Sequence, residues 1–204
     1  MDEYNVNRIE LRGAMAELPR FSHESRGERF WIFPLEVSRL SGAVDRINVI
    51  VRESQLAQLE ITAASKLYVS GEVRSFNNKS GEGSRLVITV FARELRFEDG
   101  DDMNAVHLYG TLCKQPNLRT TPMGREICDL MLAINRRYGR SDYLPCIAWG
   151  LKAKEAALWP VGTVCVLDGR LQSRKYIKNL DGLSVEKTAF EISVTQLRLD
   201  DESE

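Results

Sequence analysis

The sequence predicts an all-β protein made of two consecutive five-stranded barrels, each with one short helix between its third and fourth strands. Three observations lead to this prediction: short runs of alternating apolar residues, an internal repeat, and only two short helix-like segments. The chain has 204 residues, which is enough for two domains of roughly 100 residues each.

The internal repeat divides the chain into two copies. Residues 97 positions apart match in order, and the offset grows later in the copy, which indicates longer late loops in the second copy. The repeat predicts domains at 1–97 and 104–199, an acidic linker at 98–103 and an acidic tail at 200–204. The pairs are Asn7 and Asn104, Leu11 and Leu108, Gly13 and Gly110, Pro19 and Pro116, Gly27 and Gly124, Leu35 and Leu132, Val37 and Ile134, and Arg39 and Arg136.

The predicted elements of the second copy follow one another in a recognisable order. Its five strands are predicted at 104–113, 126–136, 143–150, 163–175 and 187–199. A helix is predicted at 151–159, because this segment is rich in Ala and Leu and is followed by Pro160. The first copy has a corresponding helix at 53–60. Five antiparallel strands with a helix between the third and fourth have the element order of the OB barrel.

The strand YLPCIAWG at 143–150 poses a question of orientation. Its period of two places Tyr143 and Trp149 on one face, whereas Leu144, Cys146 and Ala148 lie on the other. Either the aromatic residues form the core, or they lie on an outer surface where something flat stacks on them.

Charge is distributed unevenly along the chain. The whole chain has a formal charge of −1, but residues 5–97 hold 14 Lys and Arg against 11 acidic residues, and residues 103–199 hold 14 against 8. The other acidic residues lie at the start, in the segment 98–102 and in the tail. Basic blocks favour a polyanionic partner, although ordinary surface charge stays an alternative, especially for the first block.

Several classes of function are not indicated. The four cysteines form no C-x-x-C pair, and the chain has only two histidines, so we expect no metal and buried, apolar cysteines. No Walker motif occurs, and GEGSR at 81–85 lacks the lysine of a phosphate loop, so we expect no enzyme and no cofactor. The absence of a membrane-spanning run and of a signal-peptide pattern predicts a cytoplasmic protein.

The second copy resembles the bacterial single-stranded-DNA-binding protein family over almost its whole length. The first copy matches more weakly, through its repeat of the second, so the chain resembles a two-OB-fold member. The motifs that carry the resemblance are NAVHLYGTL at 104–112, PNLRTTPMGR at 116–125, LAINRR at 132–137, YLPCIAWG at 143–150, GTVCVLDGRLQSRKY at 162–176 and TAFE at 188–191.

The resemblance implies that aromatic residues of the second copy stack on DNA bases, with Tyr143 and Trp149 facing outward. On the fourth strand the same alternation sends Cys165, Leu167 and Leu171 inward. A buried Trp149, a plain exposed Tyr138 and an ordinary basic hairpin around Tyr176 are the alternatives. The predicted nucleic-acid-binding residues are Tyr138, Tyr143, Trp149, Tyr176, Arg119, Arg136, Arg137, Arg170, Gln172, Arg174 and Lys178.

The first copy lacks these aromatic residues. Arg46 and Arg52 stand at the places of Tyr143 and Trp149, and Ser41 and Asn78 at those of Tyr138 and Tyr176. We therefore predict an auxiliary unit that supplies electrostatic grip or a subunit interface, and the cluster FWIF at 30–33 is a further candidate for stacking. The predicted auxiliary residues are Arg46, Arg52, Arg74 and Phe76.

The sequence thus predicts a non-catalytic protein that binds single-stranded DNA without sequence preference, in replication, repair or recombination. Cations would neutralise phosphates while rings stack on bases. Two alternatives stay open: an RNA-binding or primosome-type OB module, and an assembly module without a nucleic-acid ligand.

The resemblance also bears on protein partners. It implies a homodimer with four OB folds, and the outward-facing Val164 and Val166 favour a buried subunit contact. Replication or recombination proteins are candidate partners. Family members commonly recruit them through a flexible tail with an apolar tip, whereas here the last strand runs into DDESE, so we do not expect recruitment by such a tail.

Overall fold

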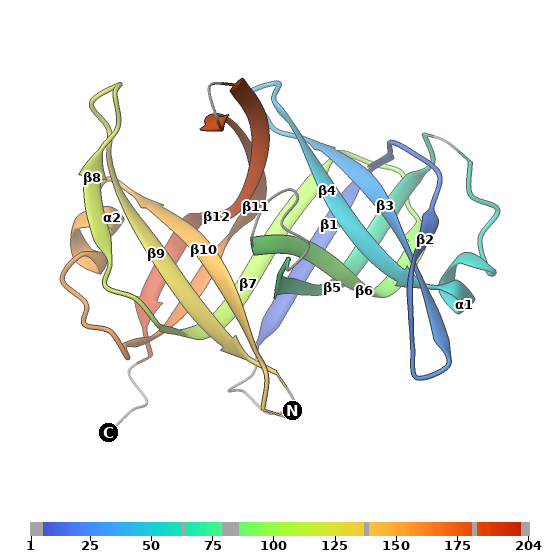
Figure 1. Ribbon diagram of the computed structural model, residues 1–204, viewed down its shortest axis with the longest axis horizontal. Coiled ribbons are helices and arrows are strands. Elements are labelled where there is room, and N and C mark those ends of the chain that lie inside the picture. Colours follow the sequence, from blue (N-terminus) through green and yellow to red (C-terminus); the bar gives the residue numbers. More distant parts are fainter. Residues whose placement is uncertain (1–5, 63, 79–85, 137–138, 181–182, 201–204) are drawn as a thin grey trace. The chain divides into compact units, whose positions relative to one another are not determined.

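The computed structural model describes residues 6–62, 64–78, 86–136, 139–180 and 183–200, and within these ranges the chain is mostly β-strand (Figure 1). The chain divides into two compact units. We call residues 8–74 and 88–105 the N-terminal unit, and residues 1–7, 75–87 and 106–204 the C-terminal unit. Residues 75–87, which the repeat assigns to the first domain, are therefore part of the C-terminal unit. The bounds of independently folding domains stay a prediction.

Each unit is a closed barrel of five strands with one short additional strand. The strand order is β7-β11-β12-β10-β9-β8 in the C-terminal unit, where a β7–β9 pairing closes the barrel. It is β1-β5-β6-β4-β3-β2 in the N-terminal unit, closed by a β1–β3 pairing. The third and fifth barrel strands run parallel in both, as β10–β12 and β4–β6. The predicted fold, two tandem OB barrels, is confirmed.

The elements of the N-terminal half are β1 (Asn7–Met15), β2 (Arg20–Ser25), β3 (Glu28–Ser38), β4 (Val44–Arg52), α1 (Glu53–Leu56), β5 (Lys66–Asn77) and β6 (Leu86–Phe97). Those of the C-terminal half are β7 (Met103–Leu112), β8 (Asn117–Thr120), β9 (Glu126–Asn135), β10 (Ser141–Trp149), α2 (Leu151–Ala156), β11 (Val164–Leu180) and β12 (Leu183–Leu199).

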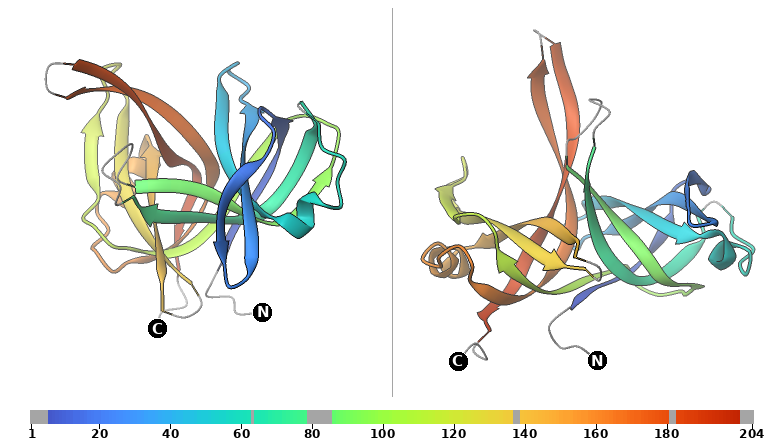
Figure 2. Two further views of the ribbon diagram at one scale, coloured as in Figure 1. Left: turned by 45° about the vertical axis from the view of Figure 1, so that its right-hand side comes forward. Right: turned by 60° about the horizontal axis from the view of Figure 1, so that its bottom comes forward.

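The structure differs from the predicted elements in three places. Both helices end three to four residues earlier than predicted, and the short strands β2 and β8 occupy the loops that begin at proline. Strand β8 is exposed throughout, so it has no alternating burial that a sequence pattern could reveal. Strands β11 and β12 form a longer hairpin than predicted, which extends past the other strands of its barrel (Figure 2).

The barrel interiors explain several of the repeated residues. Leu11 and Leu108 are fully buried in their own barrels, and burial of such a side chain stabilises by about 1.5–3 kcal/mol. The repeated glycines lie where the first strand of each barrel crosses close to the second. A Cβ at Gly13 would overlap the Glu36 carbonyl oxygen, and one at Gly110 would lie 2.9 Å from the Ala133 carbonyl oxygen.

The acidic segment that was predicted as a linker is bound to the N-terminal unit. The Arg12 guanidinium donates hydrogen bonds to the Asp101 carbonyl oxygen over 2.7 Å and to the Glu98 carboxylate over 2.5 Å. The Asp102 carboxylate accepts the Ser38 N–H over 2.7 Å and pairs with Lys66. These bonds hold the segment 98–102 against its own unit.

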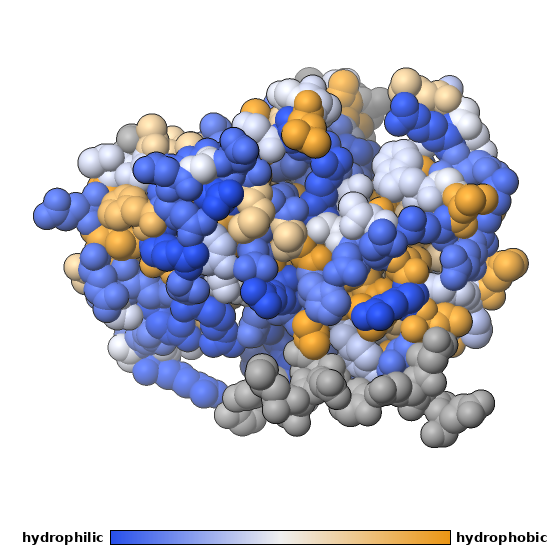
Figure 3. Space-filling view, turned by 180° about the vertical axis from the view of Figure 1, so that it is seen from behind, coloured by the Kyte–Doolittle hydropathy of each residue, from blue (hydrophilic) through white to orange (hydrophobic). Residues whose placement is uncertain are grey.

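Apolar side chains reach the surface in small areas among hydrophilic ones, as the face in Figure 3 shows. Around α2 the exposed apolar residues include Leu151, Leu158 and Val161. None of the described helices is long and apolar enough to cross a membrane.

Candidate nucleic-acid interface

Strand β10 presents Tyr143 and Trp149 outward, as predicted, whereas Ile147, between them on the same alternation, is buried. Leu144 and Ala148 are 0% exposed and Cys146 is 1% exposed, whereas Tyr143 is 49% and Trp149 36% exposed. Trp149 pairs in register with Ile127 of β9, and Ile127 pairs with Arg119 of β8. This register row therefore has an exposed indole and an exposed arginine on either side of Ile127, which is 2% exposed.

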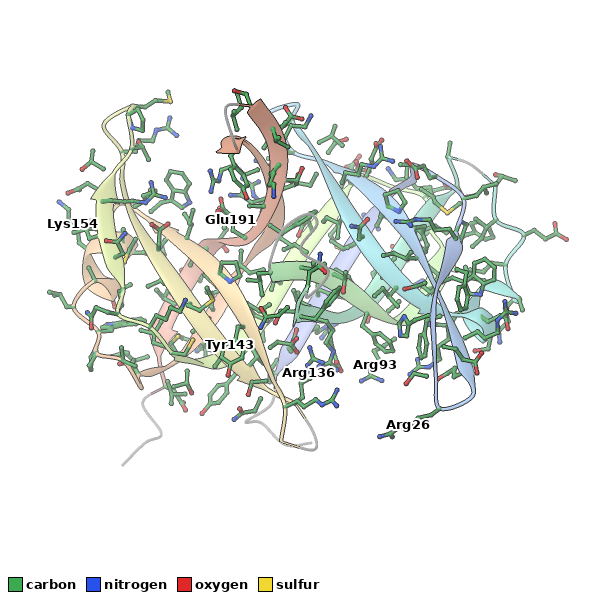
Figure 4. The ribbon with its side chains drawn as sticks, in the orientation of Figure 1. Arg26, Arg93, Arg136, Tyr143, Lys154 and Glu191 are labelled. Carbon is green, nitrogen blue, oxygen red and sulfur yellow. The ribbon has the colours of Figure 1, made fainter. Side chains whose placement is uncertain are left out.

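Strand β11 adds a third aromatic residue, Tyr176, with a cation beside it. Cys165, Leu167 and Leu171 face the interior, as predicted. The guanidinium carbon of Arg174 lies 5.8 Å from the centroid of the Tyr176 ring, within cation–π range. The Arg174 Nε also lies 3.7 Å from the Glu191 carboxylate, which is labelled in Figure 4.

Two residues predicted on this face are less open than expected. Gln172 is 8% exposed, and its amide nitrogen donates to the Glu191 carboxylate over 3.1 Å. The two residues pair in register across β11 and β12, so each satisfies a polar group of the other that solvent does not reach. Arg170 is half-buried, and its Nε is buried without a hydrogen-bond partner among the described residues.

Arg119 and Arg136 both form ion pairs within the C-terminal unit. The Arg119 guanidinium binds both oxygens of Asp129, over 2.5 and 3.0 Å, and this hydrogen bonding raises the arginine pKa. The Arg136 guanidinium donates hydrogen bonds to both carboxylate oxygens of Asp142, which is 0% exposed. Arg119 stays exposed beside its partner, whereas Arg136 is half-buried.

The Arg136–Asp142 pair has a counterpart 97 residues earlier. The Arg39 Nε donates to Asp45 over 2.7 Å, and Asp45 is buried. The repeated arginine thus holds a buried carboxylate in both barrels. Arg39 and Arg136 match in the repeat because each binds the buried aspartate of its own barrel.

Three predicted residues cannot be placed on the face. Arg137 and Tyr138 lie outside the described residues, and Lys178 lies in β11 with its side chain outside the described part. Among the residues that the structure describes, no cluster of His, Cys, Asp and Glu could hold a metal ion. Burial raises the pKa of the Cys165 thiol to about 12, and that of Cys146 is raised as well by the same cause, as expected for inert core cysteines.

The predicted auxiliary arginines of the N-terminal unit lie beside acidic residues. Arg46 pairs with Glu17, Arg52 with Glu28 over 3.0 Å, and Arg74 with Glu72. Phe76, at the end of β5, is 50% exposed.

The N-terminal unit also has aromatic side chains next to arginines, and sequence motifs indicated only one of these rings. The Phe21 and Trp31 rings meet edge to face at 6.1 Å, with the Arg29 guanidinium 5.4 and 5.7 Å from their centroids. Arg52 and Arg93 lie 5.1 and 5.3 Å from the Phe91 ring. The FWIF cluster indicated Trp31, but Phe21 belongs to the unpredicted strand β2, and Phe91 had no motif around it.

Comparison with known proteins identifies the family of the second copy. Residues 103–200 match the model of the single-strand binding protein family. The chain is 35% identical to single-stranded DNA-binding protein B of Bacillus subtilis over 89 residues, which are 40% of this chain and 78% of that protein. It is 37% identical to single-stranded DNA-binding protein 2 of Listeria innocua over 90 residues, 41% of this chain and 56% of that protein.

The similarity covers only part of the length of several curated relatives. The chain spans about half the length of several of them, including those of Bacillus cereus and Bacillus anthracis, at 48% and 47%. The crystal structure of the Thermus aquaticus single-stranded DNA binding protein has the same fold over 96% of this chain and 93% of that chain, with a TM-score of 0.77 and 20% identity. The chain therefore belongs to the single-strand binding protein family, a family of non-enzymatic DNA-binding proteins.

Proposed function

We propose that this protein binds single-stranded DNA without sequence preference, through the outer face of the C-terminal unit. The observation that carries the proposal is the exposure of Tyr143 and Trp149 on β10 while the alternating small residues are buried. Every base has a π-face, so exposed rings accept any base and contribute about 1–3 kcal/mol per stacked base.

Cations beside the rings would bind the phosphates. Arg174 lies next to Tyr176, and Arg119 is exposed in the row of Trp149. Neutralising about four phosphates would give a slope near −3 in a plot of log affinity against log salt concentration. Replication, repair and recombination are the processes that expose such strands.

Titration of the full chain with dT oligomers, followed by tryptophan fluorescence, tests the proposal. Stacking should quench Trp149, and Trp149→Phe should lose most of the quenching while Trp31 and Trp159 still fluoresce. Full quenching in that variant, or tighter binding of rU than of dT oligomers, would contradict the proposal.

We also propose a homodimer with four OB folds. Val164 and Val166 on β11 are partly exposed in the single chain, as a subunit contact requires. Light scattering should give a mass near twice the chain mass of 23.2 kDa, and a monomer at micromolar concentration would exclude this assembly.

A further inference from the structure

Ser75 is bound through all three of its polar groups to residues around the start of β10. Its N–H donates to the Asp142 carboxylate over 2.5 Å, and its hydroxyl oxygen accepts the Tyr143 N–H over 2.7 Å. Its carbonyl oxygen accepts a hydrogen bond from the Arg136 guanidinium over 3.0 Å. Ser75 is buried, and it belongs to the C-terminal unit although it comes from β5 of the first repeat.

The pairing of β10 explains why a residue from the first copy binds here. Strand β10 pairs with β9 from Ser141 to Trp149. On its other side the described pairing with β12 covers only Cys146 and Ile147, so the first half of β10 is an edge there. Pro145 lies on this edge and has no N–H to leave unpaired. The Ser75 hydroxyl oxygen accepts the N–H of Tyr143. Without it, this N–H would need a hydrogen-bond partner on a further strand.

The bonds of Ser75 fix the main chain at a ring of the proposed DNA surface. The Tyr143 N–H is held directly, and the preceding residue, Asp142, is held by Ser75 and by Arg136. Figure 4 shows Arg136 and Tyr143 at the same end of β9 and β10. A fixed main chain sets the direction in which the half-exposed Tyr143 ring leaves the strand.

We propose that Ser75 of the first repeat is a positioning residue for the stacking surface of the second, because it anchors the main chain of Tyr143. The proposal rests on the proposed function, since the ring direction matters only where bases stack on it. Ser75 itself need not touch DNA.

A double-mutant cycle on the full chain tests this role. Ser75→Ala removes the hydroxyl oxygen that Tyr143 uses and should weaken dT binding about threefold to tenfold, the value of one hydrogen bond. Ser75→Thr keeps a hydroxyl and should restore affinity to within about twofold. Ser54→Ala, at an exposed serine of α1, is the matched control and should bind like the wild type.

The cycle separates positioning from general weakening. In a Tyr143→Ala background Ser75→Ala should cost less than about twofold, whereas in a Trp149→Ala background it should keep its threefold to tenfold loss. Equal losses in both backgrounds, or no loss in the wild-type background, would overturn the proposal.

Hydrogen exchange of the Tyr143 amide gives a readout without DNA. It should be about fivefold faster in Ser75→Ala than in Ser54→Ala, and equal rates would overturn the proposal. If the wild type does not bind dT, the proposed function fails and this inference fails with it. If the wild type binds and Ser75→Ala matches it in both measurements, only the inference fails.

Discussion

The two barrels share one topology but carry different residues at equivalent places. In the C-terminal unit Ile147 of β10 pairs with Ser193 of β12, and in the N-terminal unit Ile50 of β4 pairs with Phe91 of β6. By this register Arg52 corresponds to Trp149. At these equivalent positions the N-terminal unit therefore has an aromatic ring, Phe91, on β6 and an arginine on β4, whereas the C-terminal unit has Ser193 on β12 and the ring of Trp149 on β10.

Neighbouring charges make the difference larger. Arg52 lies beside the Phe91 ring and pairs with Glu28, so it already has both an aromatic and an acidic partner. Trp149 is exposed in a unit whose sequence copy holds 14 basic residues against 8 acidic ones. The comparison teaches that an OB barrel fixes where strands run, while a few outer positions decide whether the face is open for bases.

The largest expected effect concerns what the barrels share. Asp142→Ala and Asp45→Ala each leave a partly buried arginine without its carboxylate, so each should lower the free energy of unfolding by about 3 kcal/mol. Urea denaturation measures this. Asp168→Ala, at a more exposed pair with His107, is the control and should cost about 0–1 kcal/mol. If only one of the two variants lowered the free energy of unfolding, the two ion pairs would not be structurally equivalent.

The next effect concerns the rings. Trp149→Ala should weaken dT binding by about 1–3 kcal/mol, because a stacked base loses its platform. Arg52→Ala should weaken it much less, because Arg52 is paired within its unit. Fluorescence anisotropy with labelled dT measures both, circular dichroism checks the fold, and Leu158→Ala controls for loss of an exposed apolar side chain. Equal losses at Trp149 and Arg52 would refute the asymmetry.

A smaller effect concerns the cations. Arg174→Ala should reduce the magnitude of the salt slope by about 0.7, the contribution of one phosphate on a single strand. Arg46→Ala should change the slope less, since Arg46 lies beside Glu17 and Glu36. Affinities for dT measured across a salt series give the slope of each variant. A larger change in slope for Arg46→Ala than for Arg174→Ala would contradict the prediction.

The smallest expected effect concerns how the stability of the N-terminal unit depends on pH. Hydrogen bonds from Arg12 and Arg96 lower the pKa of Glu98 below its ordinary value of 4.5. A carboxyl group with a lowered pKa stabilises the folded state above its unfolded pKa, and this contribution is lost as the pH falls through the lowered value. Glu98→Gln should therefore reduce the acid sensitivity of the N-terminal unit below about pH 4.5. Unfolding monitored at several acidic pH values tests this, and unchanged acid sensitivity would contradict it.

Sequence patterns alone predicted the repeat, the two barrels and the two faces of β10. The repeat and the strand pattern depend on local periodicity. Alternation put Tyr143 and Trp149 on one face of β10, and the resemblance to the family implied that this face is the outer one. The inward Cys146 of β10 and Cys165 of β11 followed from the same alternation, whereas Cys113, which was also expected to be buried, is partly exposed.

The partners of the polar groups could not be predicted from these patterns, because they come from strands that are far apart in the sequence. Ser75 is 67 positions from Asp142 and 61 from Arg136, and Arg52 meets Phe91 from another strand. The buried Gln172 finds its hydrogen-bond partner in Glu191 of the neighbouring strand β12, and β8 pairs with the edge of β9. Partners distant along the chain leave no periodic signal, since hydrogen bonds and ion pairs depend on which strands the fold brings together.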